Sequence, residues 1–229
     1  MKLLAVDTAA HLCAACLYDS QTRRVAGRAV EDIGRGHAER LIAVIEKALD
    51  QASLDYDSVD RLCVCVGPGS FTGIRVGVAA MRGMALSLDL PLVGVAALEA
   101  LAAEVGDERA VLAVLDARRG EVYAQLFPSG GTPSEARAMS PEEAMALAVD
   151  NSAVLVGSGA EIMAGQSGFD MSGLTIAKTV ATPDIETIAR LGAQRAPDAA
   201  PPGPLYLRSP DAKPQQGFAV ARRMTGHET

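Results

Sequence analysis

The chain has 229 residues, which is enough for one large domain or two small ones. Its 21 basic residues against 28 acidic residues give a formal net charge of −7, which excludes a surface that binds nucleic acid all over. Aromatic residues make up only 3% of the chain and tryptophan is absent, which disfavours a base-stacking surface. No stretch reaches the roughly 18 uninterrupted apolar residues of a membrane span, so we expect a soluble, cytoplasmic protein without a membrane partner.

The first quarter of the chain predicts three strands followed by a helix. Apolar runs indicate strands over residues 2–7, 12–18 and 24–30, and helical spacing indicates a helix over 37–52. Asp7 and His11 interrupt the first apolar region, which favours a strand over a signal peptide.

Four cysteines raise the question of a zinc site or a disulfide. Cys13 and Cys16 are three residues apart on an expected strand, so they point to opposite faces and cannot chelate one ion. Cys63 and Cys65 share a face, but no second pair stands at metal-site spacing. We therefore expect four buried free thiols.

Residues 64–78 are the most distinctive stretch of the sequence. An apolar strand ends in a Gly-Pro-Gly turn, and a long apolar helix follows over about 70–88, with Ser70 or Thr72 as its cap. Gly73, Gly77 and Gly83 lie inside this helix, where each glycine costs about 0.5–1 kcal/mol relative to alanine. We therefore expect another helix backbone to pack very closely against this helix.

The same glycines also suit a phosphate-binding loop, because a glycine-rich turn that enters a helix presents free N–H groups to an anion. The spacing Gly67-x-Gly69-x-x-x-Gly73 is one residue too long for the dinucleotide fingerprint. No Lys-Ser/Thr pair follows Gly73, as a P-loop would require. Close helix packing is the favoured interpretation, and a phosphate site is the alternative.

The sequence contains an internal repeat. Residues 3–17 and 111–127 are each an apolar strand that ends in an aspartate, Asp7 or Asp116, followed by a short turn and a second strand with small residues. This duplicated unit predicts two similar lobes that face each other across a cleft. The remaining expected elements are a strand over 91–95, helices over 96–104 and 141–148, a strand from residue 153 that ends in a glycine turn, and a helix within 182–196.

This pattern predicts a first lobe over residues 1–105, a second lobe over 106–196 and a C-terminal segment over 197–229. The prolines of residues 199–204 make a stiff linker to Leu205-Tyr206-Leu207-Arg208. The apolar Leu-Tyr-Leu needs a docking site, so we expect the segment to pack back on the first lobe or on a partner. The last residues are polar and are expected to be mobile.

Five segments together resemble the TsaB family, also called YeaZ, of the bacterial machinery that makes threonylcarbamoyladenosine next to the anticodon of tRNA. The third segment is highly specific, and all five occur in the expected order along the chain. They are residues 4–8 (LAVDT), 36–41 (GHAERL), 67–77 (GPGSFTGIRVG), 115–123 (LDARRGEVY) and 204–208 (PLYLR).

The resemblance implies an α/β protein of the actin-like ATPase fold, related to sugar kinases and heat-shock ATPases. Two duplicated ribonuclease H-like lobes would each hold a mixed sheet flanked by helices. It also implies a non-catalytic scaffold that dimerises with the catalytic sibling TsaD through a helical bundle, with the TsaE ATPase as a third member. Alone, such a chain would form a homodimer, and it would meet tRNA only through the complex. The helices over 37–52 and 70–88 would form the bundle, with His37, Arg40, Leu41, Val44, Phe71, Ile74, Gly77, Val78 and Met81 as contact residues.

The resemblance also bears on metal and nucleotide binding. The sibling TsaD binds a metal through a His-x-x-x-His pair, but here the fourth residue after His37 is Leu41, so no metal site is expected. Related kinases place a glycine-rich turn after the first aspartate, whereas Thr8-Ala9-Ala10-His11 follows Asp7. Asp7 and Asp116, with Arg118 beside them, are a candidate nucleotide or magnesium site, or else aspartates that cap turns. ATP and magnesium are expected at most in the complex.

Two other functions stay open. The chain could be an enzyme in its own right, an ATP-dependent phosphotransferase or a metallopeptidase, although neither a first phosphate loop nor a second metal ligand is visible in the sequence. It could also be a direct tRNA-binding module, which the acidic charge and the few aromatic residues disfavour. Arg118 and Arg119 are where RNA contact would be expected, either on phosphate or as no more than a solvated turn.

Overall fold

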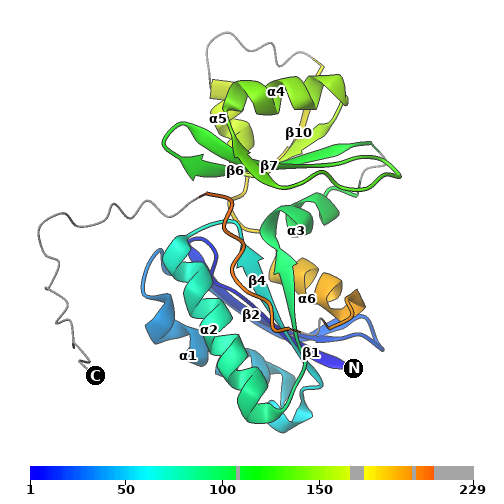
Figure 1. Ribbon diagram of the computed structural model, residues 1–229. Helices are drawn as coiled ribbons and strands as arrows, with labels where there is room; N and C mark the ends of the chain where they lie inside the picture. Colours follow the sequence, from blue (N-terminus) through cyan, green and yellow to red (C-terminus); the bar gives the residue numbers. More distant parts are fainter. Residues whose placement is uncertain (107–108, 166–172, 198–199, 209–229) are drawn as a thin grey trace, which may run out of the picture.

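The computed structural model describes residues 1–106, 109–165, 173–197 and 200–208, which form two lobes, each built on a five-stranded sheet (Figure 1). In chain order, the first part holds β1 (Lys2–Asp7), β2 (Leu12–Asp19), β3 (Arg24–Asp32), α1 (His37–Ala52), a 3-10 turn (Tyr56–Ser58), β4 (Arg61–Gly67), α2 (Phe71–Leu88), β5 (Leu92–Ala96) and α3 (Ala97–Ala103). The second part holds β6 (Val111–Arg118), β7 (Glu121–Phe127), β8 (Arg137–Met139), α4 (Pro141–Asp150), β9 (Val154–Val156), α5 (Gly159–Gly165), β10 (Thr175–Lys178) and α6 (Ile185–Gln194). The elements expected from sequence are confirmed, and β8, α5 and β10 are additions to them.

The two sheets have the same strand order. The first sheet runs β3-β2-β1-β4-β5, and the second, read from its β8 edge, runs β8-β7-β6-β9-β10. In each sheet the central strand is antiparallel to its hairpin partner, β2 or β7, and parallel to β4 or β9 on its other side. The duplication predicted from one pair of strands thus extends to the whole sheet. The predicted α/β architecture of two duplicated lobes, each with a mixed sheet flanked by helices, is confirmed.

Both faces of the first sheet are covered by helices, as the unbroken apolar run of β4 requires. Successive side chains on a strand point to opposite faces. Cys63 packs under α6, where its thiol donates to the Ile188 carbonyl at 3.7 Å, and the next residue, Val64, faces Gly77 of α2. Helices α1 and α2 therefore cover one face and α6 covers the other (Figure 1). All four cysteines are buried, as expected.

Strand β6 joins the cores of the two lobes. Leu112 and Val114 point into the second-lobe core beneath α4 and α5. The alternate residues Val111, Ala113 and Leu115 belong to the larger core that includes α3 and the first lobe. Helix α3 lies between the lobes in Figure 1 and contacts both β5 and β6. This shared packing holds the two lobes against each other.

The helix starts follow local rules. Ser70 caps α2 and accepts from the Gly73 N–H, one of the two predicted caps. Ser140 and Glu143 form a reciprocal capping box at α4, with Pro141 at its first turn. Asp184 caps α6. None of the helices in the described part of the chain is long and apolar enough to cross a membrane.

The C-terminal elements differ from the predicted division of the chain. Helix α6 was expected in the second lobe, but it packs on β1, β2, β4 and β5 of the first sheet. Residues 200–208, which we call the strap, then run along the first lobe and reach the second (Figure 1). Leu205 N–H donates to the Val66 carbonyl at 2.8 Å, and Arg208 bonds the Ala117 carbonyl at 3.1 Å and the Glu121 carboxylate. The strap therefore ties the two lobes together; the predicted mobile end lies outside the described residues.

Candidate functional site

The glycines of α2 serve the packing of the chain on itself. A Cβ built on Gly73 would lie 2.1 Å from the Thr8 carbonyl oxygen, and one built on Gly77 would lie 2.5 Å from the Thr8 hydroxyl. The Thr8 hydroxyl donates to the Gly73 carbonyl at 2.7 Å. The expected close approach is therefore real, but the neighbour is the turn after β1 and not another helix. Gly83, with open space around it, has no such neighbour.

The turn before α2 is occupied by the same packing. The Ser70 N–H donates to the Ala9 carbonyl at 2.6 Å, and the Gly73 N–H donates to the Ser70 hydroxyl at 3.2 Å. A Cβ on Gly69 would lie 2.2 Å from the Ala9 carbonyl oxygen. Since two of the first amide groups already have partners within the chain, the structure favours the packing interpretation over a phosphate loop.

Most of the predicted partner contacts lie inside the first lobe. His37, Leu41, Val44, Ile74, Gly77, Val78 and Met81 are buried in the isolated chain. Arg40 and Phe71 are exposed, and Arg40 is held by an ion pair with Glu31 at 2.7 Å. The use of α1 and α2 as a partner surface stays a prediction, but the buried side chains cannot provide its contacts. Their exposed neighbours have to do so.

His37 is placed for structure. Its side chain is buried at the start of α1, and Nε2 lies 3.1 Å from the Leu12 carbonyl oxygen. Leu41, one turn later, is also buried. In the described ranges, no three His, Cys, Asp or Glu side chains are grouped so that they could hold a metal ion. The residues present do not fit the metal site of the sibling's His-x-x-x-His motif.

Asp7 and Asp116 occupy equivalent places in the two lobes and make the same local bond. Oδ1 of Asp7 accepts from the Ala9 N–H at 2.8 Å, and Oδ1 of Asp116 accepts from the Arg118 N–H at 2.7 Å. Each carboxylate thus caps the turn after its strand. Asp116 lines the cleft, whereas Asp7 is 2% exposed and does not line it. The geometry supports the turn-capping interpretation over a shared magnesium ion.

Burial raises the pKa of the Asp7 carboxyl, although bonds from Ala9 and Cys65 and the charge of His37 oppose this. A raised pKa in the folded state means that the stability from this group is full below its unfolded pKa and is lost as pH rises through the folded pKa. We expect Asp7→Asn to raise the free energy of unfolding at pH 8 and to flatten its pH dependence. Each unit of pKa difference corresponds to about 1.4 kcal/mol.

Urea denaturation between pH 4 and 8 measures this effect. Asp57→Asn, at an exposed position in the 3-10 turn, is the control and is expected to keep the wild-type pH profile. An Asp7→Asn profile as steep as that of the wild type would show that the burial of this carboxyl has no energetic consequence.

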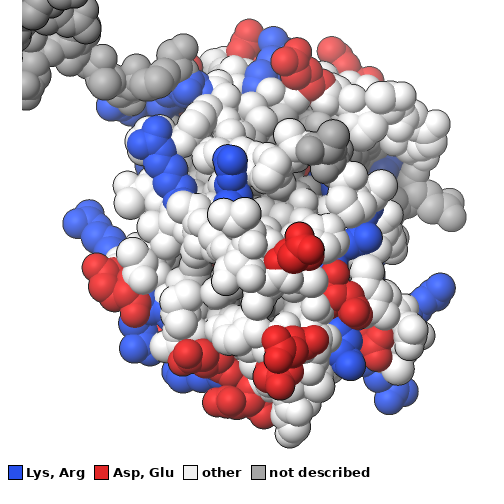
Figure 2. Space-filling model, turned by 60° about the horizontal axis from the view of Figure 1, so that its bottom comes forward, with Lys and Arg blue, Asp and Glu red and all other residues white. Residues whose placement is uncertain are grey.

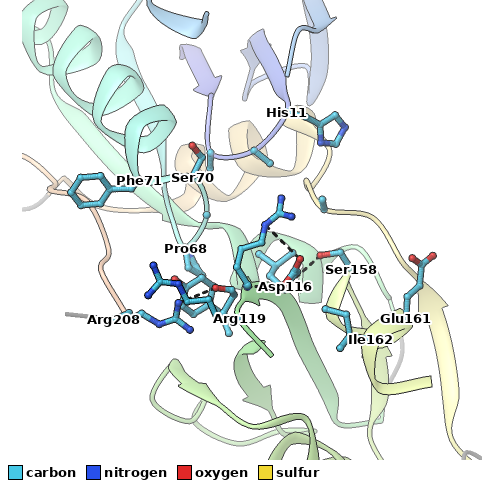
Figure 3. A pocket seen from close by; sticks show the side chains of 18 of the residues that line it. His11, Pro68, Ser70, Phe71, Asp116, Arg119, Ser158, Glu161, Ile162 and Arg208 are labelled. Atoms are coloured by element: carbon cyan, nitrogen blue, oxygen red, sulfur yellow. Dashed lines mark hydrogen bonds and ion pairs between the residues drawn. The ribbon is translucent and has the colours of Figure 1, made fainter. Parts of the chain in front are cut away.

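A cleft of about 700 Å³ opens between the lobes (Figure 3). The first lobe contributes the turn after β1 and the start of α2, including His11, Ser70 and Phe71. The second lobe contributes the end of β6, the β6–β7 turn and the start of α5, including Asp116, Ser158 and Glu161. The Ser158 hydroxyl accepts from the Asp116 N–H at 3.2 Å, which holds the floor of the cleft together. Arg208 of the strap also lines the cleft.

The turn between β6 and β7 brings two arginines to this cleft. Arg118 and Arg119 have φ values of 65° and 56°, and Gly120 has 79°, so the tight hairpin places non-glycine residues in the left-handed region. The Arg118 side chain is 86% exposed, and its Nε lies 3.6 Å from Asp116 Oδ2. Both arginines were candidate RNA-contact residues in the sequence, and the structure places both in the lining of the cleft.

A second group at the edge of the cleft was not predicted as a site. Arg75 on α2 donates through Nε to the Tyr206 hydroxyl at 2.6 Å, and its guanidinium carbon lies 3.7 Å from the centroid of the Phe71 ring. The Phe71 and Tyr206 rings are 5.2 Å apart. The signal in the sequence was Leu-Tyr-Leu after the linker, which required a docking site. That docking site is on α2, where Arg75 is 131 residues away from Tyr206 in the sequence.

Comparison with known proteins gives one family. The model of the family described as TsaD, tRNA N6-adenosine threonylcarbamoyltransferase, matches residues 17–192. The chain is 34% identical over 126 residues to the tRNA threonylcarbamoyladenosine biosynthesis protein TsaB of Escherichia coli (strain K12), covering 54% of this chain and 53% of that protein. The chain thus spans about half the length of the curated TsaB relatives it matches. An uncharacterized protein of Mycobacterium tuberculosis (strain H37Rv) is 35% identical over 215 residues, covering 93% of this chain and 94% of that one.

Solved structures agree with the sequence relatives. YeaZ from Pseudomonas aeruginosa has a TM-score of 0.68 and 28% identity, covering 84% of this chain and 91% of that chain. An uncharacterized Pseudomonas aeruginosa protein with similarity to peptidase YEAZ has a TM-score of 0.73 and 25% identity, covering 90% of this chain and 99% of that chain. The similarity therefore extends over both lobes.

Proposed function

Because the chain belongs to the TsaD family of tRNA N6-adenosine threonylcarbamoyltransferases, with TsaB (YeaZ) proteins among its relatives, we propose that it works in threonylcarbamoyladenosine formation on tRNA. Its role there is that of a non-catalytic subunit that holds the catalytic sibling TsaD in an active state. A role on tRNA places the protein in the cytoplasm. TsaE is the expected third member of the assembly.

The main support for a non-catalytic role is the burial of Asp7 and His37, the two side chains on which phosphotransfer or metal-dependent hydrolysis would depend. Asp7 is sealed beneath the cleft, and its carboxylate is held by Ala9 and Cys65. His37 is buried, and one ring nitrogen is engaged by a backbone carbonyl. Neither side chain has the access to substrate that a phosphotransferase or a metallopeptidase needs. An enzyme acting on its own is therefore the weaker proposal.

The partner surface that we propose is the exposed face of α2 next to α1. Ala79, Arg82, Gly83 and Leu86 are exposed, and their spacing places them on one side of the helix. Leu86 is 87% exposed, which is unusual for a large apolar side chain. Figure 2, which brings the first-lobe end of the molecule forward, shows uncharged surface that separate acidic and basic groups interrupt. Small and apolar residues between charges suit a helix-to-helix interface.

Reconstituted tRNA modification tests the proposed function. Purified TsaD, TsaE, tRNA and the small-molecule substrates are combined with and without this chain, and threonylcarbamoyladenosine is measured by mass spectrometry. We expect at least about a tenfold loss of product without the chain, and full activity with Asp116→Asn. Modification that proceeds equally well without the chain would contradict the proposal. A loss of activity with folded Asp116→Asn would mean that the cleft takes part in the chemistry.

A further inference from the structure

The edge of the interlobe cleft combines exposed aromatic rings with arginines from both lobes. We call this group, Phe71, Arg75, Arg118, Arg119, Tyr206 and Arg208, the cleft mouth. Phe71, Arg118, Arg119 and Arg208 line the cleft, and Arg75 and Tyr206, which do not line it, contact the Phe71 ring. Figure 3 shows Arg119 and Arg208 on one side of the opening and Ser70 and Phe71 on the other.

The charge of the cleft differs from that of the whole chain. Its lining holds Arg118, Arg119 and Arg208 against the carboxylates of Asp116 and Glu161, in a chain whose formal net charge is −7. Outside the cleft, Glu121 is bound to Arg208. Arg75 contacts two aromatic rings and a phenol hydroxyl, and these neutral groups leave its positive charge in place. The cleft mouth thus holds four arginines against the three carboxylates of Asp116, Glu161 and Glu121, and this local excess of positive charge in an acidic protein is suited to an anionic ligand.

The aromatic rings are also placed for a ligand. The chain has four phenylalanines and four tyrosines, and one of each is only half-buried at this mouth. Phe71 is 47% exposed and Tyr206 is 44% exposed. Arg75 covers one side of the Phe71 ring and Tyr206 packs against the ring as well, while Phe71 also lines the cleft, so part of its exposed surface faces the opening. Exposed aromatic faces next to arginines are the elements with which proteins bind unpaired nucleobases and the adjoining phosphates.

We propose that the cleft mouth is a contact site for single-stranded RNA, with a base on the Phe71 and Tyr206 rings and phosphates on Arg118, Arg119 and Arg208. This inference rests on the proposed function, because it takes the tRNA of the modification reaction as the ligand. The chain would then contact tRNA directly, whereas the family resemblance implied contact only through the complex. The strap supplies Tyr206 and Arg208, so it builds part of the site as well as joining the lobes.

A polymer fits this arrangement better than a single nucleotide does. Tyr206 and Arg75 lie outside the cleft lining, whereas Arg118 and Arg119 lie within it, so the cationic and aromatic groups extend beyond one cavity. Asp7, which a bound magnesium nucleotide would need in the cleft, is buried beneath it. The site therefore offers stacking and phosphate contacts without a metal group.

Fluorescence anisotropy with a labelled tRNA anticodon stem-loop tests the proposal on the full chain. The double variant Arg118→Gln/Arg119→Gln is expected to weaken binding about tenfold and to lower the slope of log K against log salt by about 0.7 for each phosphate that the variant no longer neutralises. Phe71→Leu keeps an apolar side chain and is expected to weaken binding about tenfold without changing that slope. The matched control is Arg23→Gln/Arg24→Gln, an exposed arginine pair where the β2–β3 turn enters β3, and its first residue also has a positive φ, 56°.

The outcomes separate this inference from the proposed function. The site is supported if the control pair binds RNA as the wild type does and the mouth variants bind it more weakly. In the modification assay the mouth variants should then show a higher KM for tRNA at unchanged kcat. The inference is overturned if the wild-type chain does not bind the RNA, or if the control pair loses as much RNA affinity as the mouth variants. Displacement of the RNA by an equimolar mononucleotide would overturn it as well. Mouth variants that bind RNA normally but no longer bind TsaD would make the mouth a protein contact and overturn it too. Chain-dependent modification in any of these cases would leave the proposed function standing.

Discussion

Gly73→Val is expected to lower the free energy of unfolding by about 3 kcal/mol or more, or to prevent the first lobe from folding. A Cβ at this position would lie 2.1 Å from the Thr8 carbonyl oxygen and 3.3 Å from the Ser70 hydroxyl. The first of these atoms belongs to the backbone, so no side-chain rotation relieves the overlap. Separation of α2 from the β1 turn would also break the bond from the Thr8 hydroxyl to the Gly73 carbonyl.

Gly83→Ala provides the matched control in the same helix. Gly83 is exposed, and within the described part of the chain no atom beyond its chain neighbours and the backbone of α2 lies within 4 Å of a Cβ built there. Alanine is more favourable than glycine inside a helix, so the free energy of unfolding of this variant is expected to rise by about 0.5–1 kcal/mol. Urea denaturation followed by circular dichroism measures both variants. Wild-type stability in Gly73→Val would show that the contact between α2 and the β1 turn does not hold the first lobe together.

The local elements were predictable because their signals lie within a few residues. The alternation and apolar runs of residues 2–19 predict β1 and β2, and the helical stripe after Ser70 predicts α2 together with its cap. The repeat of an apolar strand that ends in an aspartate predicts the second lobe. The equal strand order of both sheets then follows from the same duplicated unit.

The reason for the glycines was not predictable in full. A glycine in a helix indicates that something comes close, but the sequence does not say what. Here the close neighbour of Gly73 is Thr8, 65 residues earlier. The same limit applies to α6 and the strap, since Arg61 bonds the carbonyl of Arg195 134 residues later. Local spacing contains no information on which lobe such a distant element joins.

The predicted partner residues show a related limit. Leu41, Ile74 and Met81 form apolar stripes at helical spacing, and a stripe marks the face of a helix that is buried. It does not distinguish burial by the chain's own sheet from burial by another protein. The opposite face of α2 carries alanine, glycine and a single leucine among arginines, which gives a weak hydrophobic signal. The burial of the individual side chains is what separates the two faces.

That exposed face leads to the second large effect. Leu86→Glu is expected to weaken association with TsaD by at least about 100-fold, because a complex that covers this position would bury an unpaired charge in place of an apolar side chain. Leu86 is 87% exposed in the isolated chain, so the substitution is expected to leave the free energy of unfolding within about 0.5 kcal/mol of the wild-type value. Isothermal titration calorimetry with purified TsaD measures the association.

Val149→Glu is the control for this charge change, because Val149 is 53% exposed on α4 of the second lobe, away from the proposed surface. We expect it to bind TsaD with wild-type affinity. Equal weakening by both variants would point to a general effect of added negative charge on a chain that is already acidic. Wild-type affinity in Leu86→Glu would remove α2 from the interface, since no other large apolar side chain among the described residues is as exposed as Leu86. Weaker binding with Leu86→Glu alone would locate the partner on the side of α2 that the buried stripe does not use.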